Sequence, residues 1–203
     1  MQFKNRAWLI AGAVGALAVA AAPTTAQEIE VAAVAADLAA FNADMQYVFN
    51  TLLFLIGGFL VMWMAAGFAM LEAGLVRKKS VGVQCLKNIT LYSVAGLMYW
   101  VVGYNLMYVG VDGGYLGSFT PWSAGPPAAA DGYSAASDWF FQMVFVATAA
   151  SIVSGTLAER IKVVPFLLFV VVLTGFMYPI TGSWQWGGGW LAEMGFSDFA
   201  GST

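Results

Sequence analysis

The 203-residue chain is 61% hydrophobic and only 9% charged, with 11 acidic and 8 basic residues, and its mean hydropathy is +0.77. So few charges cannot cover a water-soluble domain of this length, and so few basic residues exclude a nucleic-acid-binding protein, so the composition indicates a membrane protein. The absence of His and the single Cys85 exclude His-based metal sites, a His general base and an intramolecular disulfide, and we expect no metal or cofactor.

Residues 1–26 have the pattern of a signal peptide. A basic start with Lys4 and Arg6 precedes an apolar run, and small residues end at Ala26, after which we expect cleavage. An uncleaved first helix is the alternative. Residues 27–45 are acidic and rich in alanine, and we expect them to form a short extracytoplasmic helix.

Residues 46–203 contain four apolar runs, each close to the length of about 20 helical residues that crosses a bilayer. The predicted spans cover approximately residues 47–76, 89–109, 138–160 and 164–180. The sequence therefore predicts an all-α polytopic membrane domain.

The charges predict the orientation of these spans. Beyond the signal region, every Lys and Arg follows the first or the third span, at 77–87 and 160–162, and every acid except Glu72 and Glu159 lies in the other segments. By the positive-inside rule the basic turns are cytoplasmic and the mature N-terminus is extracytoplasmic. We expect a multi-pass protein of the plasma membrane, which in a bacterium is the inner membrane.

The third span has two different faces. Phe141 and Phe145 are four residues apart and share one side, whereas small residues such as Ala147, Ser151 and Ser154 recur on the other. Small residues let a neighbouring helix approach, so the aromatic side faces lipid or a pathway. Packing is the plain explanation for such a pair; in a pathway it would form a dry constriction at which an ion sheds its water.

Trp186 precedes the run Gly187–Gly189 at the outer end of the fourth span. Tryptophans in such places are usually interfacial, as we expect for Trp184 and Trp190. The glycines also free the backbone, so the Trp186 indole can tilt over a cavity mouth and attract a small cation. Asp198 either caps the next helix or stabilises a cation in an outer vestibule, and the two roles are compatible.

Glu72 lies at the inner end of the first span. Because Arg77, Lys78 and Lys79 follow within two turns, we predict a structural ion pair with one of them, and Glu159 is interpreted in the same way beside Arg160. The chain contains no pair of nucleophile and base, phosphate-binding loop or ligand cluster, so we do not expect an enzyme.

Four segments carry a family resemblance: GFAMLEAGLVRKKS, DWFFQMVFVATAASIVSGTLAERIK, YPITGSWQWGGGWL and DFAGST. In this order they resemble the ammonium transporter family (Amt/Mep/Rh) over nearly all of residues 45–203. The resemblance implies an eleven-helix fold with inverted repeats, of which this chain holds four helices and the start of the fifth, assembled as a homotrimer. It also implies transport of ammonium or ammonia, with methylammonium as an analogue, deprotonation before a hydrophobic pore, and a cytosolic PII-type regulator as partner.

The resemblance extends to single residues. Trp186 matches the Trp of the family's outer ammonium-binding site, Phe145 a phenylalanine that gates the pore, Phe141 its neighbour one turn outward, and Asp198 an Asp needed for ammonium recognition. The family's two pore histidines are missing here; the resemblance puts the first of them three residues after Thr203. Two alternatives are an ammonium sensor built on the same membrane part, and a short protein without a pore if the chain ends at Thr203.

Overall fold

The computed structural model describes residues 26–125 and 132–202, with side chains from residue 31 onward. Nearly all of the signal peptide predicted at 1–26 lies outside these residues. Throughout the described segments the regular structure is helical, which confirms the all-α prediction. The helices are α2 (Ala26–Leu75), α3 (Val81–Met98), α4 (Tyr104–Tyr108), α5 (Ala135–Thr156), α6 (Val163–Val172), α7 (Tyr178–Gln185) and α8 (Trp190–Glu193).

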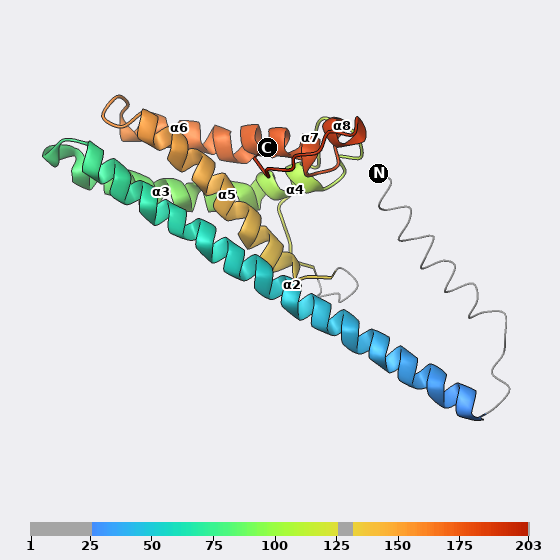
Figure 1. Cartoon of the computed structure of the whole chain (residues 1–203). Coiled ribbons are helices and arrows are strands. Elements are labelled where there is room, and N and C mark those ends of the chain that lie inside the picture. Colours follow the sequence, from blue (N-terminus) through green and yellow to red (C-terminus); the bar gives the residue numbers. More distant parts are fainter. Residues whose placement is uncertain (1–25, 126–131, 203) are drawn as a thin grey trace.

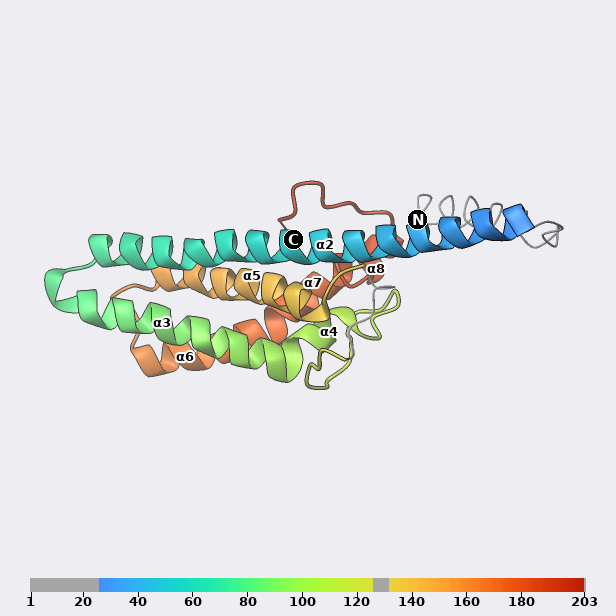
Figure 2. The same ribbon diagram turned by 90° about the horizontal axis from the view of Figure 1, so that it is seen from below.

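Helix α2 is one continuous element of 50 residues, which is about 75 Å at the α-helical rise. It contains both the acidic segment predicted at 27–45 and the first predicted span, with no break between them. The C-terminal part of α2 packs against α5 and α3, and its N-terminal part extends well past the other helices (Figures 1 and 2).

In the described residues, four helical segments are long and apolar enough to cross a membrane. They are Val31–Leu75, Lys78–Tyr108, Ala135–Thr156 and Val163–Glu193. The prediction of a multi-pass membrane protein is therefore confirmed. The boundaries differ from those predicted: the second segment begins before residue 89, and the third ends at Thr156 rather than near residue 160.

Two of these segments contain a π-helical turn, Tyr99–Gly103 between α3 and α4 and Leu173–Met177 between α6 and α7. The second turn has a cause in the sequence. Pro179 follows it and has no backbone N–H, so the carbonyl of Gly175 lacks its α-helical donor and the turn widens. The two π turns lie against each other, and a Cβ on Gly103 would lie 3.2 Å from the Thr174 carbonyl oxygen.

Helix α5 occupies the centre of the arrangement and contacts both α2 and α3 (Figure 2). Its small residues Ala147, Ser151 and Ser154 are buried, as predicted for a helix-packing face. Gly155 lies beside the Glu72 side chain, whose Oε1 would be 3.6 Å from an added Cβ.

A buried polar cluster joins α2, α3 and α5 near the end of α2. Lys87 Nζ lies 3.6 Å from Glu72 Oε2 and donates to the Ser154 carbonyl oxygen at 2.9 Å. Glu72 also accepts hydrogen bonds from the side chains of Gln84, Asn88 and Ser154. Because Gln84, Lys87 and Asn88 are three and four residues apart, they share one face of α3. The ion pair predicted for Glu72 exists, but Lys87 is its partner.

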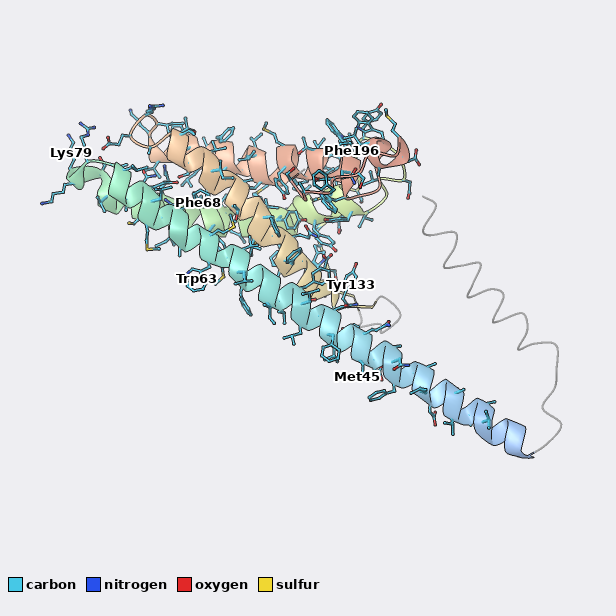
Figure 3. All side chains as sticks on the ribbon, viewed as in Figure 1. Met45, Trp63, Phe68, Lys79, Tyr133 and Phe196 are labelled. Atoms are coloured by element: carbon cyan, nitrogen blue, oxygen red, sulfur yellow. The ribbon has the colours of Figure 1, made fainter. Side chains whose placement is uncertain are left out.

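The two basic turns meet at the same end of the molecule. Arg77 Nε lies 3.1 Å from Glu159 Oε1, which joins the turn after α2 to the turn after α5. Figure 3 places Lys79 at this end and Tyr133 and Phe196 towards the other. The pairings predicted for Glu72 with residues 77–79 and for Glu159 with its neighbour Arg160 are therefore wrong. Arg77 lies past the end of α2 and reaches Glu159 instead, while α3 returns Lys87 to Glu72.

Candidate outer binding site

A cavity of about 200 Å³ lies between α4, α5 and α7. Since a liquid water molecule occupies about 30 Å³, the cavity can hold several waters or a small cation. Three of the four residues predicted from the sequence, Phe141, Phe145 and Trp186, lie in its wall. The complete lining is Met107, Phe141, Gln142, Phe145, Tyr178, Trp186 and Gly201.

The two phenylalanines form an edge-to-face pair on one side of the cavity. Their ring centroids are 5.1 Å apart and their planes make an angle of 72°, a favourable geometry for aromatic rings. Phe141 also lies 5.2 Å from the ring of Phe54 on α2. On the same helix, a Cβ added to Gly57 would lie 2.9 Å from Phe141 Cε2. Phe141 is thus wedged between α2 and the cavity, with Phe145 one turn further along α5.

Trp186 caps the C-terminus of α7, where its backbone N–H donates to the Gly182 carbonyl oxygen at 2.8 Å. Its side chain is 45% exposed. Steric contacts and backbone conformation explain why glycines follow Trp186. A Cβ at Gly187 would lie 2.0 Å from the Met107 carbonyl oxygen, and Gly188 has φ +73°, a conformation that glycine adopts without strain. The glycine run therefore lets α4 and α7 approach closely beside the indole.

Trp184 and Trp190 have a different position from Trp186. The Trp184 Nε1 donates to the Tyr115 carbonyl oxygen at 3.1 Å. The Trp190 ring lies 5.7 Å from the rings of both Trp184 and Tyr115. Neither tryptophan lines the cavity; together they attach the loop after α4 to the end of α7.

Asp198 is three residues before Gly201, which lines the cavity, but Asp198 itself is not a lining residue. The residue is half-buried, and its carbonyl oxygen accepts the N–H of Gly201 at 3.4 Å. Gly201 lines the cavity and has φ +68°. The described chain continues after Asp198 as a turn, so the predicted helix cap and the predicted vestibule role both remain predictions.

Sequence reasoning missed four lining residues, Met107, Gln142, Tyr178 and Gly201. The sequence did contain an indication for Gln142. It follows Phe141 and precedes Phe145, so a cavity lined by both phenylalanines lies close to the Gln142 backbone. Met107 and Tyr178 come from other helices, and no local pattern marks them.

Gln142 connects the cavity to a buried acid at the start of α5. Its Nε2 donates to Asp138 Oδ1 at 3.4 Å, and the Tyr104 hydroxyl donates to Asp138 Oδ2 at 2.5 Å. Asp138 is only 7% exposed. Tyr104 and Gln142 therefore both hold the Asp138 carboxyl group in place at the start of α5.

Comparison with known proteins shows the family of this chain. The model of the Ammonium Transporter Family matches residues 52–203. The chain is 44% identical to ammonium transporter Amt2 of Archaeoglobus fulgidus over 160 residues, which cover 73% of this chain and 33% of that protein. It is 38% identical to ammonium transporter Amt1 of Haloferax mediterranei over 167 residues, 76% of this chain and 31% of the relative.

Solved structures give the same result. The structure of a protein described as "Sensor Amt Protein" superposes with a TM-score of 0.70 and 31% identity, over 78% of this chain and 40% of that one. The N240A mutant of Candida albicans Mep2 superposes with a TM-score of 0.64 and 25% identity, over 78% and 36%. The chain thus spans about a third of the length of the transporters that it matches. It belongs to the Ammonium Transporter Family.

Proposed function

We propose that the protein transports ammonium across the membrane and recruits NH4+ at the cavity between Trp186, Phe141 and Phe145. One observation carries this proposal. In a chain of the ammonium transporter family, aromatic side chains from two different membrane crossings line one small cavity. No residue of this set is suited to covalent chemistry, so binding and passage are the roles that it supports.

The aromatic rings favour the charged form of the substrate. The negative face of an indole or phenyl ring attracts a cation with about 0.5–2 kcal/mol, depending on how much water has been removed. Neutral ammonia and water lack this attraction. In our proposal Asp198 adds negative charge from the neighbouring turn, and Trp186, which is still 45% exposed, receives the ion from solvent.

Beyond the cavity, the phenylalanines select against a bare ion. An ion that passes Phe145 must give up its water, and the ring returns little of the lost hydration energy. The substrate therefore gives up its proton before it enters the hydrophobic pore. The groups that would take this proton are the pore histidines implied by the family resemblance, which are not among these 203 residues.

We further propose that the cavity faces outward in the plasma membrane, with the mature N-terminus extracytoplasmic. The Arg77–Glu159 contact supports this, because it holds both basic turns at one end of the bundle. The family resemblance adds a homotrimer and a cytosolic PII-type regulator. The outer face of α2 has room for lipid or for neighbouring copies: Trp63 is 71% exposed and points away from the other helices (Figure 3).

An ammonium sensor is the second candidate, because one well-matching structure is that of a protein described as "Sensor Amt Protein". Both candidates bind ammonium at the same cavity. Purified full-length protein in vesicles separates them: uptake of radiolabelled methylammonium supports a transporter, and binding without uptake supports a sensor. Absence of both would favour a membrane protein without a pore.

The outer site is tested with Trp186→Leu in the full-length protein, with Trp63→Leu as the matched control on the exposed face of α2. We expect Trp186→Leu to raise the ammonium concentration for half-maximal uptake several-fold, because it removes the cation-binding ring. Trp63→Leu should behave as the parent protein. Unchanged methylammonium uptake kinetics in Trp186→Leu would refute the site.

A further inference from the structure

Asp138 is a buried acid without a basic partner among the described residues. These contain two ion pairs, Arg77–Glu159 and Lys87–Glu72, and neither involves Asp138. From the part of the chain that the structure describes, its carboxylate accepts hydrogen bonds from Tyr104 and Gln142. Burial of an ionised carboxylate is costly unless a positive charge lies nearby. Within the described chain Asp138 has only the N-terminus of α5 as a source of positive charge, because it lies in the first turn of that helix and pairs with no Lys or Arg.

Gln142 leads from this carboxylate into the cavity. A carboxylate only accepts hydrogen bonds, so the Gln142 amide must turn its nitrogen towards Asp138 and its oxygen away. Asp138 and Gln142 are four residues apart and share one face of α5, and Gln142 lines the cavity beside Phe141 and Phe145. The Gln142 Oε1 is thus the acceptor that this amide can offer to a molecule bound in the cavity.

We propose that Asp138 and Gln142 together make the outer cavity specific for a cation that carries N–H groups. The inference rests on the proposed transport of ammonium and deepens it. Gln142 Oε1 accepts one N–H of the ammonium ion, and the Asp138 carboxylate behind the amide supplies the negative charge that the ion neutralises. Tyr104 is a positioning residue: its hydroxyl fixes the carboxylate, and its ring is held by Tyr108 and Trp122 at 5.2 and 6.0 Å.

The alternative is a purely structural Asp138, which would only tie α4 to α5. The two roles predict different results when the negative charge is moved from residue 138 to residue 142. A structural tie is not restored when the negative charge moves one turn along the helix to the cavity wall, whereas a cation-binding charge is. The double variant Asp138→Asn with Gln142→Glu creates this displacement.

The test measures ammonium uptake by the full-length protein in vesicles, with membrane content determined for each variant. Asp138→Asn should raise KM for ammonium about tenfold and change the maximal rate less than twofold. Gln142→Leu should raise KM similarly, and Gln142→Glu in the Asp138→Asn background should restore KM to within about threefold of the parent value. Asp44→Asn is the matched control, because it removes an exposed acid from α2 and should leave KM unchanged.

Each outcome is decisive. A parental KM in Asp138→Asn, while Trp186→Leu weakens binding, overturns the role of Asp138 and keeps the proposed transport. Failure of Gln142→Glu to rescue a defective Asp138→Asn protein assigns Asp138 a structural role. If Asp138→Asn does not reach the membrane, calorimetric titration of purified Gln142→Leu with ammonium chloride decides, and parental affinity overturns the proposal. No uptake and no binding by the parent protein overturns both proposals together.

Discussion

At the scale of single residues, the environment of each acid determines its role. Glu72 and Lys87 are 2% and 3% exposed, and three side-chain hydrogen bonds surround the Glu72 carboxylate. In contrast, Arg77 is exposed and pairs with Glu159 at the surface, where an ion pair contributes little to stability. The two ion pairs therefore respond differently to the loss of one partner.

Lys87→Met leaves the Glu72 carboxylate buried without its cation. We expect a loss of about 3–5 kcal/mol in the free energy of unfolding, as is usual when one member of a buried pair is removed. Chemical unfolding of the purified protein in detergent measures it. Lys79→Met removes an exposed lysine from the neighbouring turn and should unfold as the parent does. Equal stabilities of the two variants would contradict the importance of the buried pair.

The surface pair of Arg77 and Glu159 makes the free energy of unfolding depend on pH in the acidic range. Hydrogen bonds from Ser80 and Arg77 lower the pKa of Glu159 below its ordinary value. Because the folded pKa is lowered, the stabilisation is present above the unfolded pKa of about 4.3 and is lost as pH falls through the folded pKa. Glu159→Gln should therefore lower the melting temperature at pH 7 and have little effect at a pH below both values. A constant difference across this range in thermal unfolding would speak against the pair.

At the scale of elements, α2 and α5 fit together because glycine and phenylalanine face each other. A Cβ on Gly58 would lie 2.6 Å from Phe140 Cε1, whereas nothing lies within 4 Å of a Cβ on Gly67, nine residues further along α2. The same substitution should thus have opposite effects at these two places on one helix. Phe141 follows Phe140 on α5, contacts the neighbouring Gly57 and lines the cavity. The packing of α5 on α2 therefore also positions the candidate site.

Gly58→Ala should lower the free energy of unfolding by about 1–3 kcal/mol, because the added methyl group overpacks the interface. Gly67→Ala should be neutral or stabilising by up to about 1 kcal/mol, since alanine has the higher helix propensity. Thermal unfolding of both variants provides the comparison. A Gly58→Ala protein as stable as Gly67→Ala would show that α5 shifts at no cost.

At the scale of the whole molecule, the arrangement of charge and apolar surface predicts how the bundle sits in the membrane. Both basic turns lie at one end, and residues 109–125 of the loop after α4 and the end of α7 lie at the other (Figure 1). Large apolar side chains on α2 remain exposed, Leu53 and Trp63 among them, as is expected for a surface that meets lipid or other membrane helices.

The proposed orientation is tested with single cysteines in a Cys85→Ser background, which removes the chain's only cysteine. Ser123→Cys and Lys79→Cys replace exposed residues at opposite ends. A membrane-impermeant thiol reagent added to intact cells should label Ser123→Cys and reach Lys79→Cys only after the cells are opened. The reverse pattern would invert the proposed topology.

Much of the candidate site could be predicted from the sequence, because two of its determinants are local. The spacing of Phe141 and Phe145 puts both rings on one side of a helix, and the glycines after Trp186 indicate an irregular backbone at a helix end. Both patterns are visible within a few residues. That Gly201, and not Asp198, lines the cavity was not visible in this way, because it depends on how the loop after α8 folds.

By itself, the sequence determined that this is a multi-pass helical membrane protein with its basic turns on one side. Hydropathy and charge act on each segment separately, so no tertiary contact is needed to read them. Only the tertiary structure decided that Glu72 pairs with Lys87, and that Asp138 reaches the cavity through Gln142. Such choices depend on the rotation and crossing of neighbouring helices, which side-chain packing sets once all of them are in place.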